Sequence, residues 1–211
     1  SITVEDDTDL DGIGDSVDLD SDNDGISNID ENVDCAIVNP ITGFEAYFPF
    51  ENSTEDAGGN TDYTLIRNPT GTVSYSTNRI GGSNSILFDG SYSLTDTDDD
   101  FLNEASTNSS YSFWIRPASL SGIQTLIDEG GATNGISIRL DGSSLNAAVR
   151  ESSNQLNIDT SSFPNLATNV WYHIAFTYQN GNAILYLNSM ASPTLNTGFG
   201  QLASHSDDSG I

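Results

Sequence analysis

Lysine is absent from this sequence, and only five arginines accompany 31 aspartates and glutamates, so the formal net charge at pH 7 is −26. Nucleic acids bind stripes of basic side chains, and anionic membrane surfaces attract the same side chains. Long hydrophobic runs are missing too, and no stretch approaches the about 18 apolar residues of a membrane span. We therefore expect no nucleic-acid partner and no membrane insertion.

Cysteine pairs are also missing. Cys35 is the single cysteine, so no internal disulfide can form, and without a basic neighbour we expect an unreactive thiol. The first residues lack the pattern of a signal peptide, and we interpret the sequence as a mature or excised segment. The acidity and the abundance of Ser, Thr, Asn and Asp indicate a secreted or cell-surface protein in a saline medium that contains calcium.

The acidic residues are concentrated at the start of the chain. Residues 1–34 contain thirteen carboxylates and no cation, a density typical of a disordered tail. Their spacing is nevertheless regular, because oxygen-bearing side chains recur at positions i, i+2, i+4, i+8 and i+11, and Gly12 or Gly25 follows the third. The pattern repeats after 13 residues, which a merely acidic linker would not require.

Alternating carboxylates before a glycine turn let a short loop wrap a calcium ion, which takes six to eight oxygen ligands. The expected ligands are Asp7, Asp9, Asp11, Ile13, Asp15 and Asp18 in the first loop and Asp20, Asp22, Asp24, Ile26, Asn28 and Glu31 in the second, with Ile13 and Ile26 acting through their carbonyls. Carboxylates about 4 Å apart repel by roughly 4 kcal/mol at an effective dielectric near 20. We therefore predict that residues 5–34 are ordered with calcium and disordered without it.

An EF-hand uses a similar ligand spacing but needs flanking helices, for which the sequence between the loops leaves no room. Position 8 of each loop is also unusual for an EF-hand, because Gly14 and Ser27 stand where an aliphatic residue is common. The tandem pattern Asp-x-Asp-x-Asp-Gly-x-x-Asp-x-x-Asp instead resembles thrombospondin type 3 repeats. That resemblance implies a calcium-filled, stalk-like spacer.

After Cys35 the pattern becomes that of an all-β protein, because short apolar runs with period two alternate with Gly, Asn, Asp, Ser and Pro clusters. The predicted strands are 46–50, 85–88, 111–116, 124–128, 136–140, 145–149, 170–178 and 183–187. Asp141-Gly142 and Asn180-Gly181 predict two hairpins. Alternation places Val170, Tyr172, Ile174 and Phe176 toward the core, with Trp171, His173 and Thr177 on the other face.

Six blocks of residues 44–200 resemble laminin G-like, concanavalin A-like lectin domains. They are 44–51, 56–60, 85–90, 111–117, 171–175 and 185–188. The resemblance implies an antiparallel jelly-roll β-sandwich that binds sugar or protein and is often attached to secreted polysaccharide-degrading enzymes or adhesins. It also implies a closing strand, which we do not find before Ile211. Either the sequence is cut before that strand or another polypeptide supplies it, and we expect the first strand to be unpaired or paired with another chain.

These patterns divide the chain into calcium-binding repeats at 1–34, a linker at 35–43 and a β-sandwich at 44–211. In the sandwich, the resemblance implies a further calcium site at Asp56, Asn60 and Asp62, although an ordinary solvated turn would show the same residues. For sugar binding, aromatic rings with nearby polar side chains are the candidates. They are Tyr92, Phe101, Trp114, Arg116, Trp171 and Tyr186, and the resemblance implies that the two tryptophans are frequently packing residues.

The sequence does not indicate an enzyme. No strand carries the Glu-x-Asp-x-x-Glu arrangement of a glucanase, and no Gly-x-Ser-x-Gly elbow precedes a helix, so we expect His173 to be structural. We expect a non-catalytic extracellular module that binds calcium and, through the sandwich, polysaccharide. The alternative is a cell-adhesion or spacer segment that contacts cell-surface proteins, and a polysaccharide hydrolase is the remote one.

Overall fold

A computed structural model describes residues 45–57, 63–96, 104–131, 133–152, 154–206 and 209–211. These ranges contain fourteen strands and no helix, and every strand pair is antiparallel. The all-β, antiparallel fold class that the sequence predicts is therefore confirmed. The domain boundaries that we predict at 34/35 and 43/44 lie outside the described residues and stay predictions, as do the ligands of the two calcium loops.

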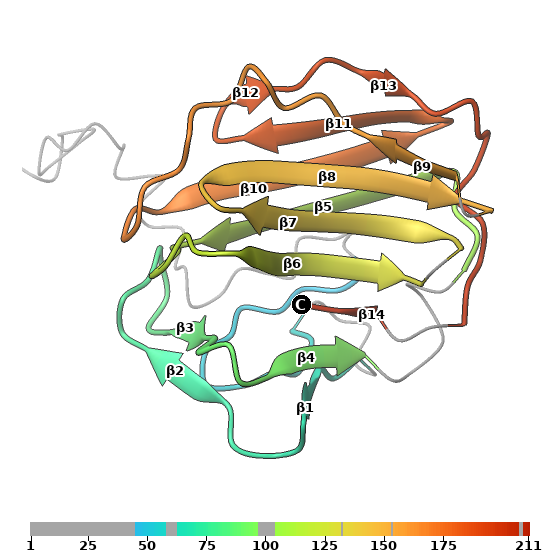
Figure 1. The fold of residues 1–211 in the computed structure, drawn as a ribbon. Helices are drawn as coiled ribbons and strands as arrows, with labels where there is room; N and C mark the ends of the chain where they lie inside the picture. The colour runs from blue at the N-terminus through green and yellow to red at the C-terminus, as the bar shows by residue number, and fades with distance from the viewer. Residues whose placement is uncertain (1–44, 58–62, 97–103, 132, 153, 207–208) are drawn as a thin grey trace, which may run out of the picture. The chain divides into compact units, whose positions relative to one another are not determined.

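The strands form two large sheets and a hairpin (Figure 1). The seven-stranded sheet has the order β1 (Ile66–Asn68), β4 (Ser93–Asp96), β14 (Ser209–Gly210), β6 (Ile123–Gly130), β7 (Gly135–Asp141), β8 (Ser144–Glu151) and β9 (Asn154–Asn157). The five-stranded sheet has the order β12 (Met190–Ala191), β11 (Asn182–Leu187), β10 (Tyr172–Gln179) and β5 (Asn108–Ile115), and β13 (Leu195–Asn196) also pairs with β11. The separate hairpin is β2 (Ser74–Ser76) with β3 (Ser85–Leu87).

The main core lies between the two large sheets, because alternate residues of their strands point toward one another. The contributors that are almost fully buried are Ile136, Ile138 and Leu140 from β7, Leu145 and Val149 from β8, Ile174, Phe176 and Tyr178 from β10, and Leu185 and Leu187 from β11. Burial of one such aliphatic or aromatic side chain contributes about 1.5–3 kcal/mol. The opposite residues on each strand are thereby directed to the outer faces of the sandwich.

Both predicted hairpins form, and their turns explain the register. Gln179 pairs with Asn182, which leaves Asn180 and Gly181 as a two-residue loop with φ angles of 46° and 84°. Asp141 pairs with Ser144 around Gly142, whose φ is 58°. Positive φ at such positions matches the right-handed twist of the flanking strands and favours Asn and Gly.

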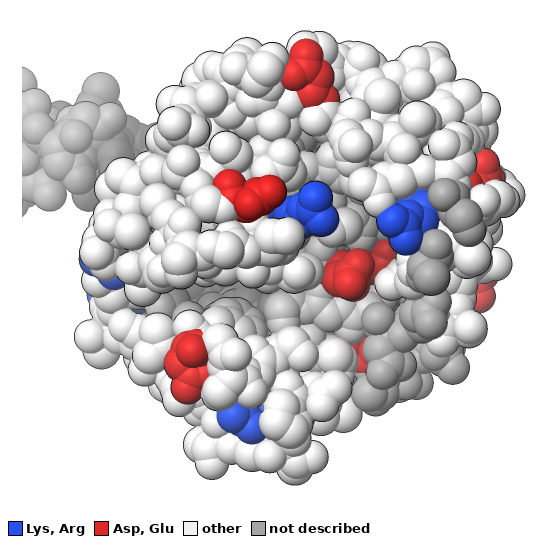
Figure 2. Space-filling model, viewed as in Figure 1, with Lys and Arg blue, Asp and Glu red and all other residues white. Residues whose placement is uncertain are grey.

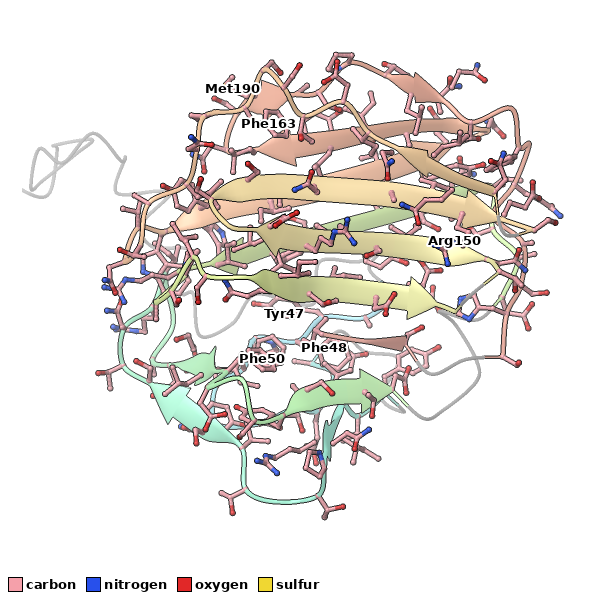
Figure 3. All side chains as sticks on the ribbon, in the orientation of Figure 1. Tyr47, Phe48, Phe50, Arg150, Phe163 and Met190 are labelled. Carbon is pink, nitrogen blue, oxygen red and sulfur yellow. The ribbon has the colours of Figure 1, made fainter. Side chains whose placement is uncertain are left out.

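Two predictions about the strands are wrong. Val170 is 44% exposed, because β10 begins only at Tyr172 and the residue lies before the paired, alternating part of the strand. Residues 46–50 form no strand, and Phe50 and Asn52 have φ angles of 57° and 61°, which turn the chain out of an extended path. Phe48 and Phe50 nevertheless pack against a second core of Leu65, Tyr92 and Leu94 (Figure 3).

The last described residues add to the seven-stranded sheet between β4 and β6. Gly210 pairs with Thr95 on one side and Asp128 on the other, and Ile211 and Leu94 exchange two backbone hydrogen bonds of 2.8 and 2.9 Å. Residues 46–50 are not a strand, so the unpaired first strand that we expect is not observed, and a missing closing strand stays a prediction. A second polypeptide that supplies such a strand stays a prediction.

Candidate functional site

A groove of about 390 Å³ runs across the outer face of the seven-stranded sheet. Its floor consists of outward-facing residues of β6–β9, and the same face is turned to the viewer in Figures 1 and 2. The outward side chains that line it are Asp128, Ser137, Arg139, Asn146, Ala148, Arg150, Gln155 and Asn157. We call this set the groove. It is polar and contains two of the five arginines.

Strand register places these side chains in rows across the sheet. Arg139 lies opposite Asn146, and Asp128 lies opposite Ser137, which in turn faces Ala148. Ala148 pairs with Asn157 on β9. A ligand that lies across the strands would therefore meet hydrogen-bonding groups from successive strands.

The next row contains Arg150 between Gly135 and Gln155. Gly135 has a φ of 136°, and a Cβ built there would lie 1.9 Å from the carbonyl oxygen of Glu129. Only glycine fits this position, so the sheet surface beside Arg150 carries no side chain there.

Hydrogen bonds fix the side chains at the β9 edge of the groove. Arg150 donates to Oε1 of Gln155, and Nε2 of Gln155 donates to Oδ1 of Asn157 at 2.8 Å. Asn146 Nδ2 donates to the carbonyl oxygen of Ser144 at 3.2 Å. These contacts restrict the rotamers of the groove residues before any ligand arrives, which lowers the entropy cost of binding.

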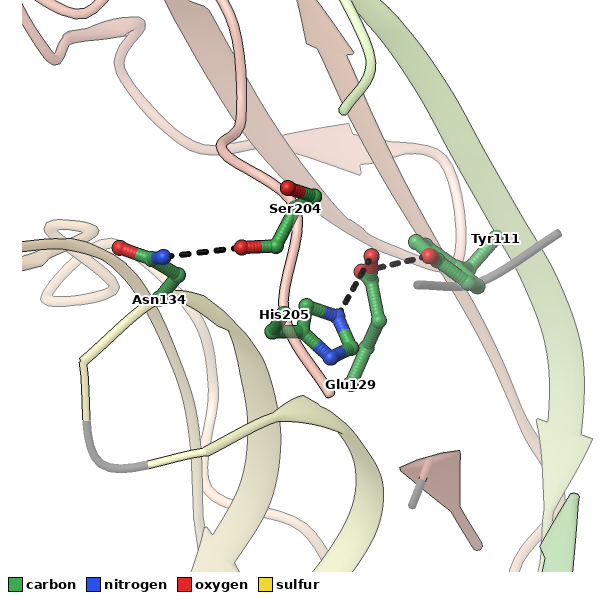
Figure 4. A network of polar contacts seen from close by, with 5 residues as sticks. All are labelled: Tyr111, Glu129, Asn134, Ser204 and His205. Carbon is green, nitrogen blue, oxygen red and sulfur yellow. Dashed lines mark hydrogen bonds and ion pairs between the residues drawn. The ribbon is translucent and has the colours of Figure 1, made fainter. Parts of the chain in front are cut away.

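A buried polar cluster lies near the groove and joins the two sheets (Figure 4). Tyr111 on β5 donates a 2.6 Å hydrogen bond to Oε2 of Glu129 on β6, and Nε2 of His205 lies 3.8 Å from Oε1 of Glu129. Burial, followed by the nearby Glu129 carboxylate and its hydrogen bond, raises the pKa of Tyr111 well above its usual value. Asn134 Nδ2 donates a 3.0 Å hydrogen bond to the carbonyl oxygen of Ser204, the residue before His205.

None of the five described sugar-binding candidates lines the groove. Tyr92 is only 9% exposed, its hydroxyl donates to the carbonyl of Leu87, and the Arg67 guanidinium covers its ring at 4.4 Å. A buried ring with a covered face cannot stack on a sugar, so Tyr92 is a packing residue. Phe101 lies outside the described residues.

Trp171 and Arg116 make contacts within the fold. The indole N–H of Trp171 donates to Oδ1 of Asn78 at 3.2 Å, and Nε of Arg116 donates to the carbonyl oxygen of Asn169 at 3.1 Å. Both side chains are half-buried. Their polar groups therefore hold neighbouring segments of this chain together.

Trp114 and Tyr186 lie on the outer face of the five-stranded sheet, as alternation predicts. Trp114 is 50% exposed, and its ring centroid lies 5.1 Å from that of His173, which sits opposite it in the register. His173 Nε2 in turn lies 2.8 Å from the Ser112 hydroxyl. The structure thus brings Trp114 and Tyr186 to one face, separate from the groove residues.

Asp56 is the one residue of the expected sandwich calcium site that the structure describes, since Asn60 and Asp62 lie outside the described residues. Its Oδ1 accepts a 2.6 Å hydrogen bond from the backbone N–H of Tyr47. Within the described ranges, no three His, Cys, Asp or Glu side chains gather as metal ligands would. In the same part of the chain, no helix is long and apolar enough to cross a membrane.

Sequence reasoning missed the groove, although the signal for it was present. Ser137 and Arg139 alternate with Ile136, Ile138 and Leu140, so their outward direction follows from the strand period. The residues that the sequence predicts for sugar binding are mostly aromatic, and none of the five described ones lies on β6–β9. That β6–β9 are neighbours in one sheet is also a property of the tertiary structure.

Comparisons with known proteins agree with this architecture. A search of curated proteins found no match. Among solved structures, domain 4 of AbnA, a GH43 extracellular arabinanase from Geobacillus stearothermophilus in complex with arabinotriose, superposes with a TM-score of 0.61 at 23% identity. The match covers 78% of this chain and 80% of that one.

The botulinum neurotoxin serotype G binding domain matches with a TM-score of 0.53 and 19% identity over 74% of this chain and 40% of the toxin chain. The receptor binding domain of botulinum neurotoxin D matches with a TM-score of 0.56 and 17% identity over 76% of this chain and 42% of the toxin chain. At these identities the likeness establishes a shared fold. The family model of the concanavalin A-like lectin/glucanases superfamily matches residues 88–209, more than half of the sequence, and the chain belongs to this superfamily.

Proposed function

We propose that this chain is a non-catalytic, extracellular module that binds polysaccharide in the groove on the outer face of the seven-stranded sheet. The observation that carries the proposal is the row of pre-positioned hydrogen-bonding side chains from β7, β8 and β9. Saccharide hydroxyls both donate and accept hydrogen bonds, and amide side chains such as Asn146, Gln155 and Asn157 match them.

Two comparisons support binding over other roles of the fold. The arabinanase domain is described in complex with arabinotriose, and the toxin domains are described as receptor-binding. Hydrolysis would require two carboxyl groups on one side of the ligand. Asp128 and Glu129 are consecutive on β6, so their side chains point to opposite faces, and Glu129 is buried beside Tyr111.

We further propose that the acidic repeats at 1–34 bind calcium and form a thrombospondin type 3-like spacer that carries the sandwich within a larger secreted or surface protein. The support is the repeated ligand spacing of the sequence. Calcium would neutralise part of the thirteen carboxylates of this segment. The calcium sites and the groove are separate parts of the proposal and are tested separately.

The groove is tested by affinity electrophoresis of the full chain on a panel of plant and marine polysaccharides. We expect retardation on at least one glycan, and we expect the double variant N146A/N157A to lose it. Tyr186→Ala on the other sheet is the matched control and should bind normally. Absence of retardation on every glycan, or an unchanged N146A/N157A variant, would refute the groove as a glycan site.

A protein-binding role is the second candidate, and the exposed Trp114 favours it. A half-exposed tryptophan beside His173 and on the same face as Tyr186 is the kind of side chain that anchors protein interfaces. If Trp114→Ala abolishes attachment to cells while glycan retardation persists, the five-stranded sheet contacts a protein. If glycan retardation is absent and cell attachment depends on Trp114, adhesion replaces polysaccharide binding as the proposed function.

A further inference from the structure

The five arginines of the chain differ in what their guanidinium groups contact. Arg67 donates to the carbonyl of Pro69 and stacks on Tyr92, and Arg79 donates to the carbonyl of Gly82. Arg116 donates to the carbonyl of Asn169, and Arg150 donates to Gln155. Arg139 is the exception, because among the described residues its side chain has neither a hydrogen bond nor an ion pair.

Arg139 lies in the middle of β7, half-buried on the floor of the groove. Its neighbours across the strand pairs are Asn146 on β8 and Thr125 on β6, and the outward residues on either side of it along β7 are Ser137 and Asp141. A guanidinium carries five N–H donors and no acceptor. This group therefore offers a fork of donors to whatever occupies the groove.

The groove has a local charge that differs from that of the whole protein. Arg139 and Arg150 stand against one outward carboxylate, Asp128, while the chain as a whole carries −26. Figure 2 shows two blue patches across the middle of this face, the left one adjoining a red patch and a second red patch lying below them. Asp141 lies outside the groove lining, so among the outward-facing lining residues the two arginines exceed the carboxylates by one charge.

We propose that the groove selects a saccharide that bears anionic groups, carboxylate or sulfate ester, and that Arg139 is the residue that binds the anion. The inference rests on the proposed polysaccharide-binding function and adds the ligand class. Guanidinium groups pair with planar carboxylates and with sulfate oxygens through two parallel hydrogen bonds. The acidic side chains on the rest of the surface would repel the same polymer, so binding would be confined to the groove.

The test compares matched ligands at 0.15 M NaCl on the full chain by isothermal titration calorimetry. One pair is polygalacturonate oligomers and their methyl esters, and the other pair is dextran sulfate and dextran. We expect at least one anionic member to bind more tightly than its neutral partner. Arg139→Gln should weaken that binding about 10- to 100-fold, the usual effect of losing a charged hydrogen bond.

Two further variants make the result specific. Arg79→Gln removes the same charge from a loop outside the groove and should bind as the wild type does. Arg139→Lys keeps the positive charge but loses the paired N–H donors of the guanidinium, so its affinity should lie between those of Arg139→Gln and the wild type. Urea unfolding of each variant shows whether the fold is retained. Polygalacturonate and dextran sulfate report separately on carboxylate and sulfate.

The outcomes separate this inference from the proposed function. Equal affinity for charged and neutral partners would overturn the anionic ligand class and leave a neutral-glycan groove. Anionic binding that is unaffected by Arg139→Gln and is lost with a chelator would also overturn it, because calcium on the acidic segment would then hold the polymer. If no glycan of the wider panel binds, the proposed function itself fails.

Discussion

The hydroxyl of Tyr111 and the carboxylate of Glu129 form a 2.6 Å hydrogen bond that connects β5 of one sheet with β6 of the other. Both side chains lie in the interior, and Tyr111 packs against Phe176 with ring centroids 6.1 Å apart. A polar bond in this place ties the two sheets together through a defined pair of atoms. The buried carboxylate of Glu129 relies on the Tyr111 hydroxyl as its hydrogen-bond donor.

Tyr111→Phe tests this dependence. The variant leaves one oxygen of a buried carboxylate without its donor, so we expect the free energy of unfolding to fall by about 1–3 kcal/mol. Tyr186→Phe, on the outer face of the five-stranded sheet, is the control and should change it by less than about 0.5 kcal/mol. Urea unfolding curves of the full chain measure both. Equal stability of the two variants would contradict the structural role of the bond.

Alkaline pH should weaken the fold through the same tyrosine. The pKa of Tyr111 is raised in the folded state, so its contribution is fully present below the unfolded pKa of about 10 and is lost as pH rises toward the folded value. We expect the stability difference between wild type and Tyr111→Phe to shrink from about pH 10 upward. Urea unfolding at pH 8 to 11 gives this difference, and a difference that grows with pH would contradict the assignment.

Phe176 and Val170 provide a test of the core. Phe176 is fully buried between the sheets, whereas Val170 is exposed ahead of β10. We expect Phe176→Ala to cost about 3–5 kcal/mol through the lost burial and the cavity left behind. Val170→Ala should cost less than about 0.5 kcal/mol. Thermal and urea unfolding of both variants check the prediction.

Alanine variants of Gly181 and Gly198 distinguish the cost of a left-handed backbone from the cost of a steric clash. Both have positive φ, but a Cβ at Gly181 would lie 2.3 Å from the carbonyl oxygen of Phe199, and a Cβ at Gly198 meets nothing within 4 Å. Gly198→Ala should therefore cost about 1–2 kcal/mol for the left-handed backbone alone. Gly181→Ala should cost clearly more, as measured by urea unfolding. Equal losses would show that the Phe199 segment moves aside freely.

Calcium binding by the acidic repeats is tested by titration calorimetry of the full chain after treatment with a chelator. We expect calcium to bind and to produce a change in circular dichroism. We also expect the double variant D22N/D24N to lose the contribution of the second loop while retaining that of the first, because each loop has its own ligands. Unchanged spectra and melting on calcium removal would refute the calcium-dependent order predicted for residues 5–34.

The sequence by itself determined the all-β class and the paired strands around Asn180-Gly181 and Gly142, because these are consequences of local periodicity and of backbone conformations that few residues adopt. It also determined that Ile174 and Phe176 face inward and Trp114 outward, since the strand period is two. The error at Val170 arose because the paired strand begins only at Tyr172, a boundary that alternation alone does not mark.

Only the tertiary structure decided where the polar side chains meet. The groove depends on β6, β7, β8 and β9 being neighbours, so that Asp128, Arg139 and Asn157 share one face although they are far apart in the sequence. The burial of Tyr92 and the sheet-to-sheet bond between Tyr111 and Glu129 depend in the same way on long-range packing. Local sequence patterns fix the direction of a side chain relative to its own strand, and sheet order fixes what that side chain faces.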